Sequence, residues 1–210
     1  MAHIETTPED QELAEIEVEV KACRHCELAL PHGPRPVIQV DSRAKILIAG
    51  QAPGSKVHAS GIPFDDASGD RLREWMGLDK SLFYNPEQIA ILPMGFCYPG
   101  KGKSGDLPPR DECAPLWRQK LLDKMPDIQL TIVIGKYAMD WHPTGSTKKN
   151  LTDTVKNWLN SDDNQAIVPM PHPSPRNNIW LKRNSWFEER LVPLLRQRVQ
   201  AALNQTHPDN

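Results

Sequence analysis

The chain has 210 residues, which suits one domain with a sizeable buried core. A formal net charge of −2, from 25 Lys and Arg against 27 Asp and Glu, argues against indiscriminate binding of polyanions. No apolar run approaches the roughly 20 residues that a membrane span needs, and the acidic N-terminus lacks the pattern of a signal peptide. We therefore expect a cytoplasmic protein with no membrane partner.

The predicted elements alternate between helix and strand. Thr7 and Pro8 have the form of a helix start and predict a helix over residues 8–22. Ser68 is expected to cap a second helix, and Ser185 with Glu188 forms a capping box for the last one. Short apolar runs predict strands at residues 45–49, 88–92, 130–134 and 166–170. The helices expected after the first lie at residues 69–76, 108–125, 151–159 and 185–203, with another short helix after a turn that starts at Gly135.

This alternation predicts an α/β fold of three layers, α/β/α, around a central, mostly parallel four-stranded sheet. No internal repeat, low-complexity segment or long linker divides the chain. We therefore expect a single domain over residues 1–210, with the N-terminal helix 8–22 ahead of a core over about 23–204. We also expect the protein to be a monomer.

Two loops that follow predicted strands carry unusual sets of residues. The histidine loop, His172–Asn177 (HPSPRN), follows the last strand, and its prolines stiffen a backbone that presents a ring, a hydroxyl, a guanidinium and an amide. The glycine loop, Gly50–Gly54 (GQAPG), follows the first strand, and its glycines let a ligand approach the backbone. Because ligands of open α/β sheets bind beyond the carboxyl ends of the strands, we expect both loops to face one site.

A segment between the two loops adds an aromatic ring and two carboxylates. Phe64 is suited either to stacking on a planar base or to packing in the core. Asp65 or Asp66 is suited to orienting and activating a water molecule. The alternative role for these acids is to stabilise the start of the following helix through its dipole.

The four cysteines suggest metal binding rather than disulfides in a reducing compartment. Cys23 and Cys26 have chelating spacing, and Cys97 with Cys113 would complete a set of four thiolates. Four thiolates suit zinc or an iron–sulfur cluster, and composition does not choose between them. The alternative is four unrelated cysteines, two of them buried as small apolar residues.

The motifs together resemble the uracil-DNA glycosylase superfamily, over roughly Cys23 to Leu195. The order is GQAPG, then GxPF with SG, then HPSPRN, each after a strand. The cysteine spacing, with 70 residues between Cys26 and Cys97 and 15 between Cys97 and Cys113, is similar to that of the iron–sulfur ligands of the family 4 enzymes. HPSPRN itself resembles the loop of the single-strand-selective monofunctional glycosylases.

The resemblance implies a monofunctional hydrolase that removes a damaged base, uracil first of all, from DNA in base excision repair. The target nucleotide is flipped into a pocket, and His172 donates a hydrogen bond to the departing base. Arg176 fills the gap that the flipped base leaves. The residues implied in base binding are Gly50, Gln51, Ala52, Phe64 and His172, and those in DNA binding are Pro53, Gly54, Ser174, Arg176 and Asn177. The implied cofactor is a [4Fe-4S] cluster on Cys23, Cys26, Cys97 and Cys113, with structural zinc as the alternative.

Two positions differ from the family 4 pattern. Gln51 stands where those enzymes have a glutamate, and an amide is not a general base, so Asp65 or Asp66 is expected to position the water alongside Gln51 and His172. Pro93 stands where an asparagine reads the uracil edge. Another deaminated base is therefore an alternative substrate, and a non-catalytic module that binds DNA or damaged bases is an alternative function. No lysine lies in the matched motifs to form a Schiff base, which favours monofunctional chemistry.

Overall fold

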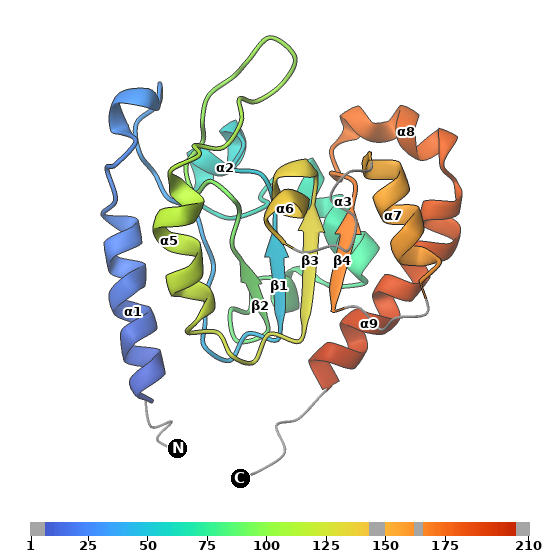
Figure 1. The fold of residues 1–210 in the computed structure, drawn as a ribbon, viewed down its shortest axis with the longest axis horizontal. Helices are drawn as coiled ribbons and strands as arrows, with labels where there is room; N and C mark the ends of the chain where they lie inside the picture. The colour runs from blue at the N-terminus through green and yellow to red at the C-terminus, as the bar shows by residue number, and fades with distance from the viewer. Residues whose placement is uncertain (1–6, 143–149, 162–165, 205–210) are drawn as a thin grey trace.

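The computed structural model describes residues 7–142, 150–161 and 166–204 (Figure 1). In this part of the chain four strands form one parallel sheet in the order β2-β1-β3-β4. The strands are β1 (Ile46–Ala49), β2 (Ile89–Ile91), β3 (Leu130–Ile134) and β4 (Ile167–Met170). All four predicted strands are confirmed, and the sheet is wholly rather than mostly parallel. Pro169 pairs with Val133 from the edge strand β4, where a residue without an N–H is tolerated.

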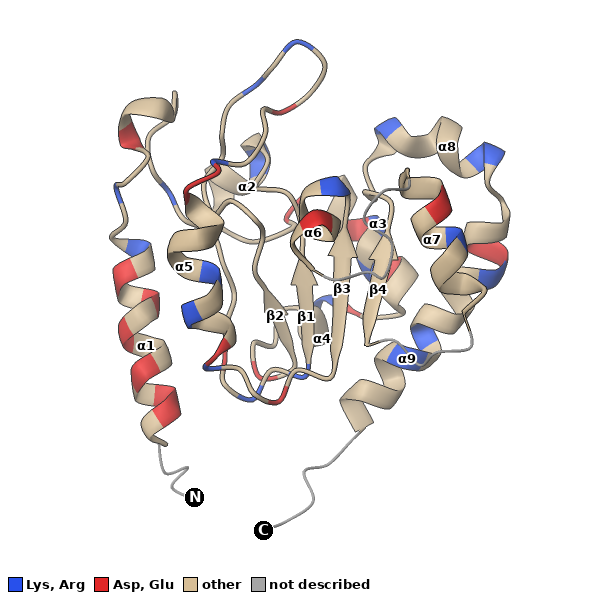
Figure 2. Ribbon diagram, in the orientation of Figure 1, with Lys and Arg blue, Asp and Glu red and all other residues tan. Residues whose placement is uncertain are grey.

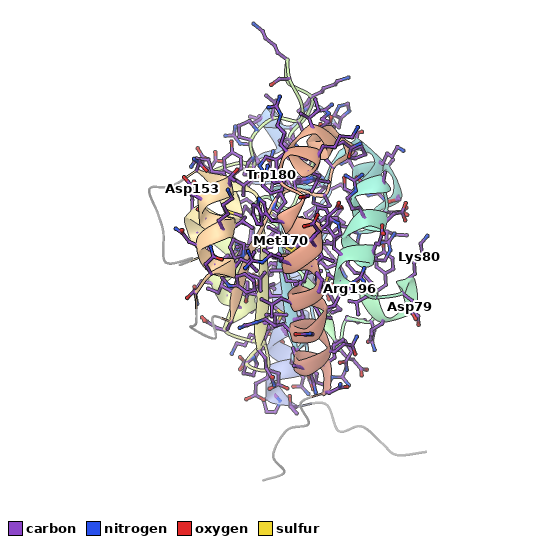
Figure 3. All side chains as sticks on the ribbon, turned by 90° about the vertical axis from the view of Figure 1, so that its right-hand side faces the viewer. Asp79, Lys80, Asp153, Met170, Trp180 and Arg196 are labelled. Atoms are coloured by element: carbon purple, nitrogen blue, oxygen red, sulfur yellow. The ribbon has the colours of Figure 1, made fainter. Side chains whose placement is uncertain are left out.

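Helices cover both faces of the sheet, as the three-layer prediction requires. Figure 3 shows Asp153 of α7 on one side and Asp79 and Lys80 of the α4 region on the other, with Met170 of β4 between them. The α-helices are α1 (Pro8–Lys21), α2 (Ser55–Ser60), α3 (Ala67–Met76), α4 (Lys80–Phe83), α5 (Cys113–Leu122), α6 (Lys136–Trp141), α7 (Leu151–Leu159), α8 (Asn178–Arg183) and α9 (Val192–Asn204). None of the described helices is long and apolar enough to cross a membrane.

Two apolar clusters lie on the two sides of β1. Ile46 and Ile48 pack into the larger cluster, which includes residues of α3 and α9. Leu47, which points the other way, packs with residues of α1 and α5. Both sides of a central parallel strand are thus buried, which explains why its sequence is continuously apolar.

Three predicted helix ends differ from the structure. Helix α3 is capped by Asp66 and not by Ser68, because the Asp66 carboxylate accepts the free N–H groups of the first turn. Helix α5 begins at Cys113 and not near Pro108. The last helix begins without a side-chain cap, as a π-helical turn over Phe187–Leu191 that leads into α9. The widened turn lies directly before Pro193, which has no N–H to close a regular helical bond.

A fully buried arginine joins α5 to the end of β2. Arg118 donates to the carbonyls of Leu92 and Pro93, the latter at 2.9 Å, and its Nη2 lies 2.8 Å from Nε2 of His142. Burial lowers the pKa of Arg118 to about 10. Burial and then the nearby guanidinium lower the pKa of His142 to about 4, so this imidazole is neutral at neutral pH and accepts from Arg118.

The neutral state of His142 makes the stability pH-dependent. Its pKa is 6.5 in the unfolded chain and about 4 in the fold, so between these values the unfolded state binds more protons. Its contribution is present above pH 6.5 and is lost as the pH falls toward 4, by about 3 kcal/mol at 1.36 kcal/mol per pKa unit. We expect His142→Gln, which keeps an acceptor, to flatten this part of the curve in urea unfolding at pH 4 to 7. The same curve for variant and wild type would contradict this.

Candidate active site

The two predicted loops line one cavity at the carboxyl ends of the strands, at the top of Figure 1. Its volume is about 510 Å³, within the range of about 300–1,000 Å³ that is usual for small-molecule sites. Most predicted site residues line it: Gly50, Gln51, Ala52, Pro53, Gly54, Phe64, Asp66, His172, Ser174, Arg176 and Asn177. Asp65 is exposed and is not among the lining residues, so the structure does not bring it into the cavity.

The geometry of the histidine loop fixes the tautomer of His172. The backbone N–H of Ser174 donates to Nδ1 of His172 at 3.2 Å, so the proton of the neutral ring lies on Nε2. Burial lowers the pKa of His172, while Asp66 and Asp106 oppose this shift. The result is a neutral imidazole whose Nε2–H is available as a donor.

Two side chains hold the histidine loop in place. Asn177 donates to the carbonyl of His172 at 2.7 Å. Arg71 on α3 donates to the carbonyls of Pro173 and Ser174, both at 3.3 Å. Sequence reasoning missed Arg71, since no local pattern shows that this helix packs against a loop about 100 residues away.

Asp66 and Phe64 lie at the start of α3. The Oδ1 atom of Asp66 accepts from the N–H groups of Ser68 at 2.9 Å and Gly69 at 3.0 Å, so the helix-capping role considered for these acids is present here. The ring of Phe64 meets Phe83 edge-on at a centroid distance of 6.2 Å and also lines the cavity. The Phe64 ring therefore packs against a core residue and also lines the cavity.

Phe64 adopts a backbone conformation that is unusual for a bulky residue. Its φ is 53°, and it is the one non-glycine residue with positive φ in the described part of the chain. The conformation brings its carbonyl close to Gly69, where an added Cβ would stand 1.8 Å from the oxygen. Gly69 therefore permits the placement of Phe64.

A hairpin that rises above the sheet in Figure 1 forms the third wall of the cavity. We call it the flap, Gly100–Leu107; Lys101 and Asp106 form an antiparallel bridge, and the N–H of Leu107 donates to the carbonyl of Gly100 at 2.9 Å. Both loops hold it. Gln51 Nε2 donates to the Leu107 carbonyl at 3.0 Å, and Arg176 Nη1 donates to the Ser104 carbonyl at 3.3 Å.

The flap carries site residues that sequence reasoning did not assign. Gly105 and Asp106 line the cavity, as does Lys56 of α2. Glycines at 100, 102 and 105 are the signal that would have predicted a hairpin here. Figure 2 shows Lys and Arg on the flap and on α8, at the same end of the molecule, which gives this end a basic component despite the acidic total.

The four cysteines line a second pocket with apolar walls. All four are free, and the N–H of Phe96 donates to Sγ of Cys113 at 3.3 Å. Burial raises the pKa of Cys97 to about 11 and that of Cys113 to about 12, with further contributions from neighbouring cysteines. Within the described ranges no three His, Cys, Asp or Glu side chains are placed to hold a single metal ion. The donor set nevertheless fits a thiolate-bound group, because four thiols from three segments of the chain meet in one pocket.

The contact between Gly69 and Phe64 generates a prediction. We expect Gly69→Ala to lower the free energy of unfolding by about 1–3 kcal/mol or more, since the new Cβ collides with backbone that must move. Gly50→Ala is the matched control, because its Cβ would meet only the tip of Phe64 at 3.7 Å, an ordinary contact. Urea unfolding measures both. Equal stability of the two variants would show that Phe64 does not depend on Gly69.

Comparison with known families places these features in context. A family model described as the uracil DNA glycosylase superfamily matches residues 37–196, more than half of the chain. The match includes the glycine loop, the flap and the histidine loop, and it begins after Cys23 and Cys26. The parallel sheet and the cavity at its carboxyl edge agree with that match. The chain therefore belongs to the uracil DNA glycosylase superfamily.

Proposed function

We propose that the protein is a monofunctional DNA glycosylase that hydrolyses the N-glycosidic bond of a damaged base, with uracil as the first candidate, in base excision repair. Membership of the superfamily supports a glycosylase-type hydrolytic function on DNA. The observation that carries the proposal is the fixed tautomer of His172, which makes Nε2–H the donor of a ring that lines the cavity. A base that leaves with the bonding electron pair gains negative charge on its oxygens, which a preorganised N–H stabilises.

The residues that line the cavity have three different roles: contact with the base, contact with the DNA backbone, and filling of the gap that the flipped base leaves. A flipped nucleotide enters the cavity, where Phe64 stacks on the base and the backbone of Gly50, Gln51 and Ala52 contacts its edge. The DNA backbone is contacted by Pro53, Gly54, Ser174 and Asn177. Arg176 is exposed at the rim, and we propose that its guanidinium fills the gap left by the flipped base.

Two residues of the cavity, Pro93 and Gln51, bear on which base the protein prefers. Pro93 lines the cavity and has no side-chain donor or acceptor, and the Nε2 group of Gln51 is bound to the flap. Discrimination between bases therefore falls to backbone groups and to the shape of the cavity. A different deaminated base, or binding of the lesion without cleavage, is the alternative that these two residues favour.

The four cysteines are proposed to hold a [4Fe-4S] cluster, with zinc as the alternative. Cys23 and Cys26 follow α1, Cys97 follows β2, and Cys113 begins α5, so a bound group would cross-link three parts of the chain. The four thiols line one pocket, which supports a thiolate-bound group at this place. Its contribution would be structural, because protein thiolates fill all four ligand positions. We also propose that the protein is a monomer in the cytoplasm, a reducing compartment in which thiols persist.

Base release from DNA tests the proposed activity. We expect the wild type to leave an alkali-labile site in a uracil-containing oligonucleotide, and His172→Ala to lower the single-turnover rate by roughly 10²–10³-fold through loss of one oxyanion donor. Lesion-free DNA is the control substrate, and a panel of deaminated bases in single and double strands sets the preference. No base release from any lesion, with binding retained, would favour the non-catalytic alternative. Borohydride trapping of the protein on DNA would instead identify a Schiff base, with Lys56 as the cavity lysine.

Visible absorption tests the cysteine site. We expect protein purified without oxygen to be brown, with stoichiometric iron and sulfide, and Cys97→Ser to lose the colour and unfold at a lower temperature. A colourless preparation with one zinc per chain would replace the cluster by zinc. A preparation that contains neither metal, together with an unchanged melting temperature in Cys97→Ser, would contradict both.

A further inference from the structure

The cavity contains two carboxylates, and their surroundings differ. Asp66 lies at the start of α3, where its Oδ1 accepts two backbone N–H groups and so serves the helix. Asp106 lies on the flap, an element with no role in the core. Both residues line the same cavity as His172, and both carboxylates oppose the lowering of its pKa by burial.

Three features define the surroundings of Asp106. Burial and then the nearby Asp106 carboxylate raise the pKa of Tyr98, a buried residue at the base of the flap. The Oδ2 atom of Asp106 lies against the glycine loop, since a Cβ added to Gly54 would stand 3.5 Å from this atom. The carbonyl of the next residue, Leu107, accepts from Gln51 Nε2 at 3.0 Å. The amide of Gln51 therefore holds the flap backbone next to Asp106.

We infer that Asp106 is a catalytic residue that positions the hydrolytic water and stabilises the positive charge of the sugar. The inference rests on the proposed glycosylase function and assigns the group for the step that Gln51 cannot perform as an amide. Asp106 suits the step because it is exposed at the cavity and its carboxylate has lone pairs that can accept from a water molecule. It lies on the flap, whereas His172 lies on the histidine loop, so the two residues reach the cavity from different segments.

The chemical step balances with water as the only co-reactant. The C1′–N bond breaks, and its electron pair leaves with the base, whose oxygen accepts a hydrogen bond from Nε2–H of His172. The remaining oxocarbenium ion lies next to the Asp106 carboxylate, which lowers its energy. The water oxygen forms the new C1′–O bond, and its proton passes to Asp106 and then to solvent, while the base anion takes a proton from solvent.

Substitution of Asp106 tests the inference. We expect Asp106→Asn, which keeps the shape of the side chain and one carbonyl oxygen, to lower the single-turnover rate of base release by roughly 10²-fold, the lower end of the range for a general base. Binding to DNA with a non-hydrolysable 2′-fluoro nucleotide should remain as tight as in the wild type, or become tighter. Asp106→Glu should restore part of the rate, and added formate should accelerate Asp106→Ser. Asp123→Asn, an exposed carboxylate at the other end of α5, is the matched control.

The outcomes separate this inference from the proposed function. In one outcome, the wild type releases base while a folded Asp106 variant, Asp106→Asn or Asp106→Ser, retains at least half of the wild-type rate. In that case Asp106 is not the catalytic carboxylate, and the proposed glycosylase function still stands. A second result would also overturn the role of Asp106. In it, Asp66→Asn lowers the single-turnover rate as much as Asp106→Asn does, while Asp106→Glu and formate added to Asp106→Ser restore none of the rate; the catalytic carboxylate would then be Asp66. If the wild type releases no base from any lesion, both proposals fail together.

Discussion

The parallel pairing of β1 with β2 and β3 is the constraint on which the rest of the site depends. Parallel strands bring all their carboxyl ends to one edge of the sheet, and with β4 on the far side of β3 the loops after β1 and β4 both emerge there. The strands are short and buried on both sides, so their register is strongly specified. A shift in that register would move the glycine loop relative to the histidine loop, even with every site residue unchanged.

Above this edge, the two loops act through the backbone as much as through their side chains. Ser174 contributes an N–H that sets the tautomer of His172, and the carbonyls of Pro173 and Ser174 bind Arg71. These groups are present whatever the side chains are, but only a stiff loop holds them at a fixed angle. The prolines of the histidine loop therefore matter because they limit the conformations from which the imidazole must be oriented.

Much of the fold and part of the site could be predicted from the sequence. The strands were predictable because short continuous apolar runs between turn residues are typical of buried strands, and the two loops because they follow strands of a parallel sheet. Phe64 was predicted as a site residue, but its positive φ depends on Gly69, five residues later, and no local rule links them. The predicted cap of α3 was wrong because two residues that can cap a helix, Asp66 and Ser68, lie close together in the sequence. Only one of them is the N-cap in the structure, Asp66. Arg71 and Asp106 were not predicted as site residues. Each reaches the site through contacts with segments that are distant in the sequence, and no local pattern indicates such contacts.

The attachment of the flap has a consequence for how this site can diverge. Gln51 and Arg176 both bind it through main-chain carbonyls, those of Leu107 and Ser104. Neither bond uses a flap side chain, so the side chain that the flap presents to the cavity, that of Asp106, can be exchanged while these two bonds remain. The bonds that hold the hairpin and the side chain that it presents to the cavity are therefore separate, and selection can alter the second without altering the first.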